Sequence, residues 1–197
     1  MNIEIFLALA GFSFVSSITP GPNNLMLLAS GVNYGFRRTI PHMLGISAGF
    51  AFMLVCVGLG LAQLLLHAPL VYMGLKIAGG VYLLYLAYRI ATSGPLETGD
   101  GKNAPMTFLQ AAAFQWVNPK AWVMAVTAMT AYTNSQSYLF TVAIIVVVFT
   151  LINLPCVSIW CVFGTGMRGF LSDAKRLKIF NITMAVLLVI SLWPMLA

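Results

Sequence analysis

The chain has 197 residues, of which 60% are hydrophobic and only 7% are charged. Soluble domains carry about 25% charged residues, so this composition excludes a water-soluble globule and places the chain in a lipid bilayer. The net charge of +6 does not indicate nucleic-acid binding, because the basic residues form no stripe with interleaved aromatic side chains. Apolar runs are continuous, as in residues 138–149, which excludes the alternating strands of a transmembrane barrel and predicts an all-α integral membrane protein.

Six apolar segments are long enough to cross the bilayer, since one helical crossing needs about 20 residues. They cover approximately residues 3–29, 40–66, 70–91, 107–132, 138–163 and 179–197. The connections carry glycine and proline turn signals, the first of them over residues 30–39, and none is long enough to form a separate domain. The whole chain, 1–197, is therefore predicted to be a single transmembrane domain.

The basic residues are distributed unevenly among the connections. The odd-numbered connections and their flanks hold Arg37, Arg38, Arg89, Lys102, Arg168, Lys175, Arg176 and Lys178, whereas the even-numbered connections and both termini hold none. Cytoplasmic loops retain an excess of Lys and Arg. The distribution therefore predicts cytoplasmic odd-numbered connections and places both termini outside the cytoplasm.

The six crossings divide into two groups of three, about residues 1–92 and 106–197. An odd number of crossings makes the second group enter from the opposite side, so the two groups are predicted to be inverted three-helix repeats. Each group has a proline-containing break in its first helix, helix one and helix four of the chain. The breaks are formed by Thr19, Pro20, Gly21, Pro22, Asn23 and Asn24, and by Asn118, Pro119 and Lys120. Breaks at matching positions of inverted repeats are typical of transporter binding sites near the midplane.

The first break removes backbone hydrogen bonds, because proline lacks an N–H group. Carbonyl groups at about residues 15–18 are expected to lose their partners within the helix. Exposed backbone in lipid costs several kcal/mol per group, so the break should line a cavity or be buried in protein. A simple kink packed against neighbouring helices is the alternative, but the polar side chains around both breaks favour a cavity.

The polar groups at the two breaks suit charged partners of both signs. The N–H groups of Asn23, Asn24 and the restarted helix suit a carboxylate, while freed carbonyls and the amide oxygens of Asn23, Asn24 or Asn118 suit an ammonium group. Lys120 either pairs with the carboxylate or extends to the membrane interface.

Further polar residues lie inside apolar segments. Lys76 in the third segment is a candidate site residue, with extension to the interface as its alternative, and Asn153 in the fifth either lines the same cavity or only accompanies a kink. No Asp or Glu lies in the middle of a segment, so a titrating group would be a lysine, His42 or the solute itself, and His42 is expected at a loop edge. The pair Gly45 and Gly49 predicts close approach of two helices.

Five motifs follow one another along the chain: residues 19–24, Gly35-Phe36-Arg37, residues 45–49, residues 75–83 and Asn118-Pro119-Lys120. In this order and spacing, over essentially the whole chain, they resemble the lysine-exporter (LysE/RhtB-type) family of bacterial amino-acid efflux proteins, most closely the subgroup that exports cysteine and O-acetylserine. The resemblance implies export of small neutral amino acids or derivatives from the cytoplasm across the bacterial inner membrane. With this location, the charge distribution places both termini in the periplasm, and no cofactor is expected. The resemblance also implies protons as the coupling ion, and therefore an antiporter. A second copy of the chain, forming a homodimer, is retained as a candidate partner.

Three classes of function are open to a chain of this kind. A secondary exporter with alternating access agrees with the paired breaks, and the absence of a Walker motif argues against ATP hydrolysis by this chain. An intramembrane enzyme is disfavoured, because the zinc-protease, serine-hydrolase and paired-carboxylate patterns are absent. A membrane thiol relay is the runner-up. It would use Cys56 and Cys156 in helices two and five, and it requires these two thiols to come within bonding distance.

Overall fold

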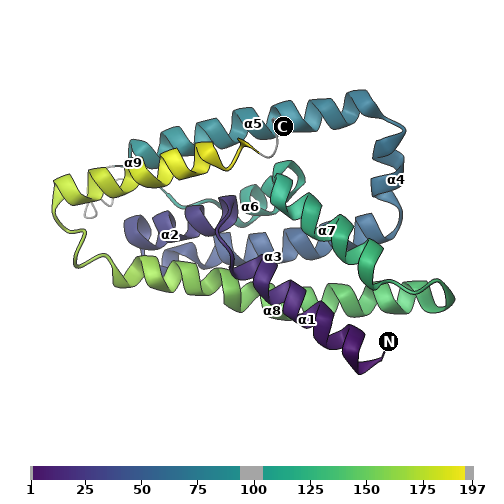
Figure 1. The fold of residues 1–197 in the computed structure, drawn as a ribbon. Coiled ribbons are helices and arrows are strands. Elements are labelled where there is room, and N and C mark those ends of the chain that lie inside the picture. Colours follow the sequence, from purple (N-terminus) through teal and green to yellow (C-terminus); the bar gives the residue numbers. More distant parts are fainter. Residues whose placement is uncertain (1, 94–103, 194–197) are drawn as a thin grey trace.

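The computed structural model describes residues 2–93 and 104–193, and all regular structure in these two ranges is helical (Figure 1). The α-helices are α1 (Ile3–Ile18), α2 (Pro22–Tyr34), α3 (Phe36–Gly58), α4 (Leu61–Leu66), α5 (Pro69–Ala91), α6 (Phe108–Phe114), α7 (Pro119–Tyr132), α8 (Tyr138–Gly166) and α9 (Ala174–Ile190). Two 3₁₀ turns, η1 (Gln115–Val117) and η2 (Ser135–Ser137), precede α7 and α8. The all-α prediction is confirmed.

The six predicted segments correspond to α1 with α2, α3 with α4, α5, α6 with α7, α8, and α9. The predicted first connection over residues 30–39 is wrong, because α2 continues to Tyr34 and Gly35 alone joins it to α3. Gly35 has a φ of 80°, a conformation that glycine adopts without steric cost. Of the two glycines that suggested a loop, Gly35 alone makes the turn, and the hydroxyl oxygens of Ser30 and Thr39 lie 2.9 Å apart in a hydrogen bond across it.

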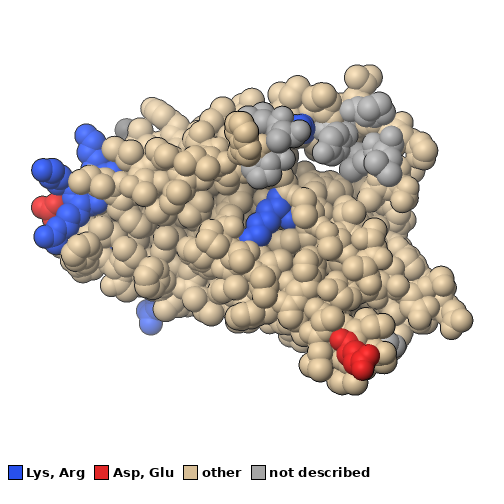
Figure 2. All heavy atoms as spheres, viewed as in Figure 1, with Lys and Arg blue, Asp and Glu red and all other residues tan. Residues whose placement is uncertain are grey.

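The chain runs back and forth along one long axis (Figure 1). The turn at Gly35, the end of α5 and the connection from α8 to α9 lie at the same end of the molecule. Lys and Arg side chains gather at this end, around the start of α9 (Figure 2). The basic connections therefore share one end, as the charge distribution predicts, and the side of the membrane that this end faces stays a prediction.

Two stretches of the described residues are long and apolar enough to cross a membrane, Phe36–Gly58 and Ser135–Gly166. A third candidate is the pair of α1 and α2, which pass the same test together and are bent by 52° at the break between them. The structure thus has two or three candidate spans by length and composition. The full set of six crossings and their division into repeats stay predictions.

The core is organised around α3 and α8. Helix α8 packs against α1, α2 and α3, while α3 also packs against α6 and α7, and α5 packs against α9. A Cβ atom added at Gly45 or Gly49 would collide with the backbone of α6, at Phe108 or Ala112. The predicted close approach at this glycine pair is therefore confirmed, and it holds the second break against α3.

Candidate functional site

The first break separates α1, which ends at Ile18, from α2, which begins at Pro22. The N–H group of Thr19 still donates to the Val15 carbonyl at 3.1 Å, because the regular pattern fails only from Pro20 onwards. Pro20 has no N–H group to donate to the Ser16 carbonyl, so the carbonyl groups that lose their backbone partners begin at Ser16, one residue later than the sequence predicts. The predicted loss of the Val15 partner is wrong for this reason.

Side chains replace the missing donors at the end of α1. The Asn24 amide donates through Nδ2 to the carbonyls of Ser17 and Thr19, at 2.8 and 2.7 Å. The Trp160 indole, on α8, donates to the carbonyl of Ile18 at 3.0 Å. Since buried carbonyls without a donor cost free energy, these two side chains stabilise the broken backbone.

Lys120, at the other break, is a third side chain that donates hydrogen bonds to the first break. Its ammonium donates to the Thr19 carbonyl at 2.7 Å, to the Thr19 hydroxyl at 3.0 Å and to the Pro20 carbonyl at 3.3 Å. The side chain passes directly over Gly21, where an added Cβ would lie 2.7 Å from its Cδ. Lys120 therefore turns onto the first break, and the missing side chain at Gly21 makes room for it.

The second break has a different local structure. Helix α6 ends at Phe114, one 3₁₀ turn follows, and Asn118 is the N-cap of α7. The Asn118 side chain accepts a hydrogen bond from the backbone N–H of Lys120 at 3.1 Å, which satisfies one free donor at the helix start. Pro119 occupies the first turn of α7, where its missing N–H group is not needed. The predicted interruption of this segment is confirmed.

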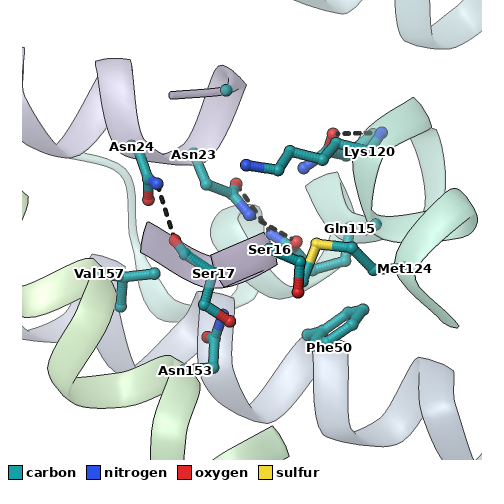
Figure 3. Close-up of a pocket in the computed structure, with 13 residues that line it drawn as sticks. Ser16, Ser17, Asn23, Asn24, Phe50, Gln115, Lys120, Met124, Asn153 and Val157 are labelled. Carbon is teal, nitrogen blue, oxygen red and sulfur yellow. Dashed lines mark hydrogen bonds between the residues drawn. The ribbon is translucent and has the colours of Figure 1, made fainter. Parts of the chain in front are cut away.

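A pair of amides joins the two breaks. Asn23 donates to the Gln115 side-chain oxygen at 2.8 Å, and Gln115 donates back to the Asn23 oxygen at 3.2 Å. Gln115 is fully buried, at 0% exposure, and also donates to the Ala111 carbonyl at 2.9 Å. Figure 3 shows Asn23, Gln115 and Lys120 converging on one space from separate segments. Sequence reasoning missed Gln115, although an amide three residues before Asn118 in an apolar segment is a usable signal.

Asn153 connects a third helix to the same place. Its Nδ2 donates to the Ser17 hydroxyl at 3.2 Å, and its Oδ1 accepts from the Ser47 hydroxyl at 3.2 Å. The residue thereby links α8 to α1 and α3, so the reading in which Asn153 lines the cavity holds. Neither serine was singled out from the sequence, because serine in an apolar helix commonly bonds to its own backbone.

These groups enclose a small cavity of about 20 Å³ (Figure 3). Its lining includes the predicted site residues Gly21, Asn23, Asn24, Asn118, Lys120 and Asn153. The lining also includes residues that the sequence did not indicate, namely Ser16, Ser17, Phe50, Gln115, Met124 and Val157. This volume holds about one water molecule and is too small for an amino acid. In this conformation the polar groups are paired with one another.

The other predicted site residues lie outside the lining of this cavity. Thr19 and Pro20 take part through their contacts with Lys120, and Pro22 and Pro119 begin the two restarted helices. Lys76 is half-buried on α5, and the structure does not bring it to the breaks.

The expected loop-edge position of His42 is wrong, because its side chain is buried, with 2% exposure. The reason is the single-residue turn before α3, which starts that helix at Phe36. His42 thereby lies inside the packed part of the helix.

The cysteine positions argue against a thiol relay. Helices α3 and α8 lie side by side, with Ser47 bonded to Asn153, and run in opposite directions (Figure 1). Cys56 lies nine residues after Ser47, and Cys156 lies three residues after Asn153. At 1.5 Å per residue the two cysteines are about 18 Å apart along the helix axes, whereas a disulfide needs Cα atoms within about 7 Å.

The sequence is similar to known proteins over most of its length. The LysE type translocator family matches residues 14–191. The cysteine/O-acetylserine efflux protein of Escherichia coli (strain K12) is 32% identical over 196 residues, which cover 96% of both chains. The proteins of the same description from Shigella sonnei (strain Ss046) and Escherichia coli O1:K1 / APEC are 32% and 31% identical, again over 96% of both chains. No solved structure gives a significant match.

A match over this much of the chain defines the class of protein as a membrane transporter. The chain belongs to the LysE type translocator family. It is accordingly an amino-acid efflux membrane protein and not an enzyme.

Proposed function

We propose that this protein exports small neutral amino acids or close derivatives, of the cysteine and O-acetylserine type, from the cytoplasm. The names of its relatives support the substrate class. The observation that carries the proposal is the bridge between the two breaks, in which the Lys120 ammonium is held by the carbonyls of Thr19 and Pro20. An amino acid can replace both partners of this pair, because its carboxylate can bind the ammonium group and its own ammonium group can bind the carbonyls.

The replacement follows from hydrogen-bond strength. A carboxylate is a stronger partner for an ammonium group than a carbonyl is, because both members of the new pair are charged. The substrate carboxylate would therefore take the Lys120 ammonium, and the substrate ammonium would take the released carbonyls of Thr19 and Pro20. The start of α2, at Asn23 and Asn24, adds backbone N–H groups and a positive helix dipole beside the carboxylate.

The apolar lining suits a small side chain. Phe50, Met124 and Val157 face the same cavity as the polar groups. The described lining contains no Asp or Glu, so it offers no carboxylate for a second positive charge on the solute. A neutral side chain is thus favoured over a basic one.

Alternating access between two inverted repeats is the proposed transport mechanism. The helix pairings support it: α1 and α2 pack on α8, α6 and α7 pack on α3, α3 packs on α8, and α5 packs on α9. If segments one, two and three are exchanged with segments four, five and six, each of these contacts becomes a contact of the same set. Two repeats related by a two-fold axis require this equivalence. The Asn23–Gln115 and Lys120–Thr19 bonds cross between the halves, so opening the site would break both.

Protons are the proposed coupling ion, which makes the protein an antiporter of amino acid against proton. Lys120 is the titratable side chain in the lining of the cavity. A proton gained or lost there would change the pairing of the two breaks directly. This couples protonation to the same contacts that the substrate replaces.

The test is counterflow of radiolabelled O-acetylserine, cysteine and lysine in vesicles that contain the purified protein. We expect exchange of the first two and little of the third. Pro20→Ala and Asn118→Ala should abolish exchange while the protein still inserts. Asn134→Ala is the matched control, because Asn134 caps η2 outside the cavity. Wild-type exchange in both break variants would refute the central site.

A further inference from the structure

A second cavity, of about 50 Å³, lies between α2, α3 and α5. Asn33 and Tyr34 at the end of α2, His42 on α3 and Arg89 on α5 are among the residues that line it. The positions of Asn33 and Tyr34 next to Gly35 place the cavity in the half of the molecule that carries the basic connections (Figure 1). It is separate from the cavity at the breaks, and the proposed exchange does not use its side chains.

His42 has unsatisfied hydrogen-bonding groups in this cavity. His42 is buried, with 2% exposure. Among the described residues, neither of its ring nitrogens has a hydrogen-bond partner. An imidazole ring always has at least one N–H donor, and a buried polar group without a partner is costly and rare in native proteins. The contents of the cavity must therefore provide the partner.

Arg89 also makes few hydrogen bonds to the described residues. It is half-buried, and in the described structure its guanidinium makes one long hydrogen bond, from Nη2 to the Ala104 carbonyl at 3.4 Å. A guanidinium has five N–H donors in a planar arrangement that matches a carboxylate. The described lining of the cavity contains no Asp or Glu. Among the residues that the structure describes, the lining thus holds a cation and no anion.

Two neighbouring polar side chains of the lining, Asn33 and Ser30, are already paired. Asn33 donates to the Ala29 carbonyl at 2.8 Å and to the Asn181 side chain at 2.9 Å. Ser30 is bonded to the Thr39 hydroxyl. The availability of a guanidinium and an imidazole in one cavity indicates a small solute with a carboxylate and a second polar group.

We propose that this cavity is a second substrate site, in which Arg89 binds the carboxylate of the solute and His42 hydrogen-bonds its other polar groups. The identity of the solute rests on the proposed export function. Helix α2 connects the two sites, since Asn23 lines the cavity at the breaks and Asn33 lines the second one. These residues are ten positions apart, or about 15 Å along the helix. The solute binds first at Arg89 and then passes along α2 to Lys120.

The present volume has room for about three or four water molecules, so binding of an amino acid requires lining side chains to move. Met26 and Met106 also line this cavity. Their flexible thioether side chains can repack around a solute. This favours a site that accepts small neutral side chains of several shapes.

The experiment uses histidine NMR on the full-length protein in nanodiscs of phosphatidylcholine. The chain has two histidines, His42 and His67, so ¹⁵N-histidine labelling gives two imidazole spin systems, and His42→Gln assigns them. Titration with O-acetyl-L-serine should move the His42 signal saturably and leave His67 unchanged. Arg89→Gln should raise the half-saturating concentration at least tenfold. A static His42 signal, or an unchanged titration in Arg89→Gln, would overturn the proposal.

Controls separate this site from the central one. Arg176→Gln removes an exposed guanidinium at the same end of the molecule and should titrate as the wild type does. Arg89→Lys, which keeps the charge, serves if Arg89→Gln does not fold, and it should give an intermediate weakening, whereas wild-type titration would again contradict the site. Lys120→Gln should keep the His42 response while it loses efflux.

The remaining outcomes decide between occupants and between proposals. Nanodiscs with phosphatidylglycerol and no solute test for a lipid headgroup. If that lipid moves the His42 signal and O-acetylserine does not, the second site is refuted. A saturable His42 response in a wild-type protein without transport would support the second site and refute the export function. Loss of the His42 response in Lys120→Gln would show one site in place of two.

Discussion

Replacement of Lys120 tests the central claim about the helix breaks. Lys120→Gln removes the ammonium group and with it the hydrogen bonds to the Thr19 carbonyl, the Thr19 hydroxyl and the Pro20 carbonyl. The Thr19 carbonyl keeps its bond from Asn24 at 2.7 Å, so only part of the bridge is lost. Hydrogen bonds in membrane proteins contribute about 0.6 kcal/mol each. The unfolding free energy should therefore fall by no more than about 2 kcal/mol, and the protein should still fold.

The effect on transport should be larger than the effect on folding. If Lys120 pairs with the substrate carboxylate, the variant loses a charge-assisted hydrogen bond worth about 1.5–3 kcal/mol. Each 1.4 kcal/mol corresponds to about a tenfold change. We therefore expect efflux of O-acetylserine at low substrate concentration to fall about ten- to a hundredfold. Lys120→Arg keeps the charge and should retain more activity than Lys120→Gln.

The assay is the initial rate of efflux from vesicles, divided by the amount of folded protein in them. Lys76→Gln is the matched control, because it removes the same charge from a helix outside the cavity lining. That variant should transport at close to the wild-type rate. Equal rates in Lys120→Gln and the wild type, or an equal loss in Lys76→Gln, would refute the assignment of Lys120 to the carboxylate.

Three further predictions concern packing, the break and orientation. Gly49→Ala should lower the unfolding free energy by about 1–3 kcal/mol, because its Cβ would collide with the backbone of α6. Gly80→Ala has open space and should be neutral or slightly stabilising in thermal denaturation, and equal midpoints for the two variants would contradict the close crossing. Asn24→Leu leaves the Ser17 carbonyl without its Asn24 donor and should cost about 1–3 kcal/mol in the same measurement, so an unchanged midpoint would count against the capping role. A periplasm-active reporter fused after Ala197 should be active, and activity of a cytoplasmic reporter there would reverse the predicted orientation.

The resemblance and the local sequence together predicted the family, and the family comparison confirms it. The sequence alone also predicted both helix breaks. Proline lacks an N–H group wherever it occurs, so Pro20, Pro22 and Pro119 interrupt hydrogen bonding whatever the neighbouring helices do. The glycine pair at Gly45 and Gly49 was equally local, because a missing Cβ allows close approach in any packing.

Two predictions were wrong because they were made from the local sequence alone. Gly31 and Gly35 indicated a loop over residues 30–39, but Gly35 alone makes the turn, and Ser30 bonds Thr39 across it. Local composition therefore gave the wrong connection length. The same short turn buried His42, which local composition had placed at a loop edge.

The amino-acid sequence by itself determined that this protein is helical and membrane-embedded, and where two of its helices must break. Only the tertiary structure decided that Asn23 meets Gln115, that Lys120 reaches the Thr19 carbonyl, and that Lys76 lies outside the cavity lining. The physical reason is the distance along the chain over which each interaction acts. Backbone hydrogen bonding and hydrophobicity act within a few residues, whereas these contacts join segments about a hundred residues apart and depend on how α3 and α8 pack between them.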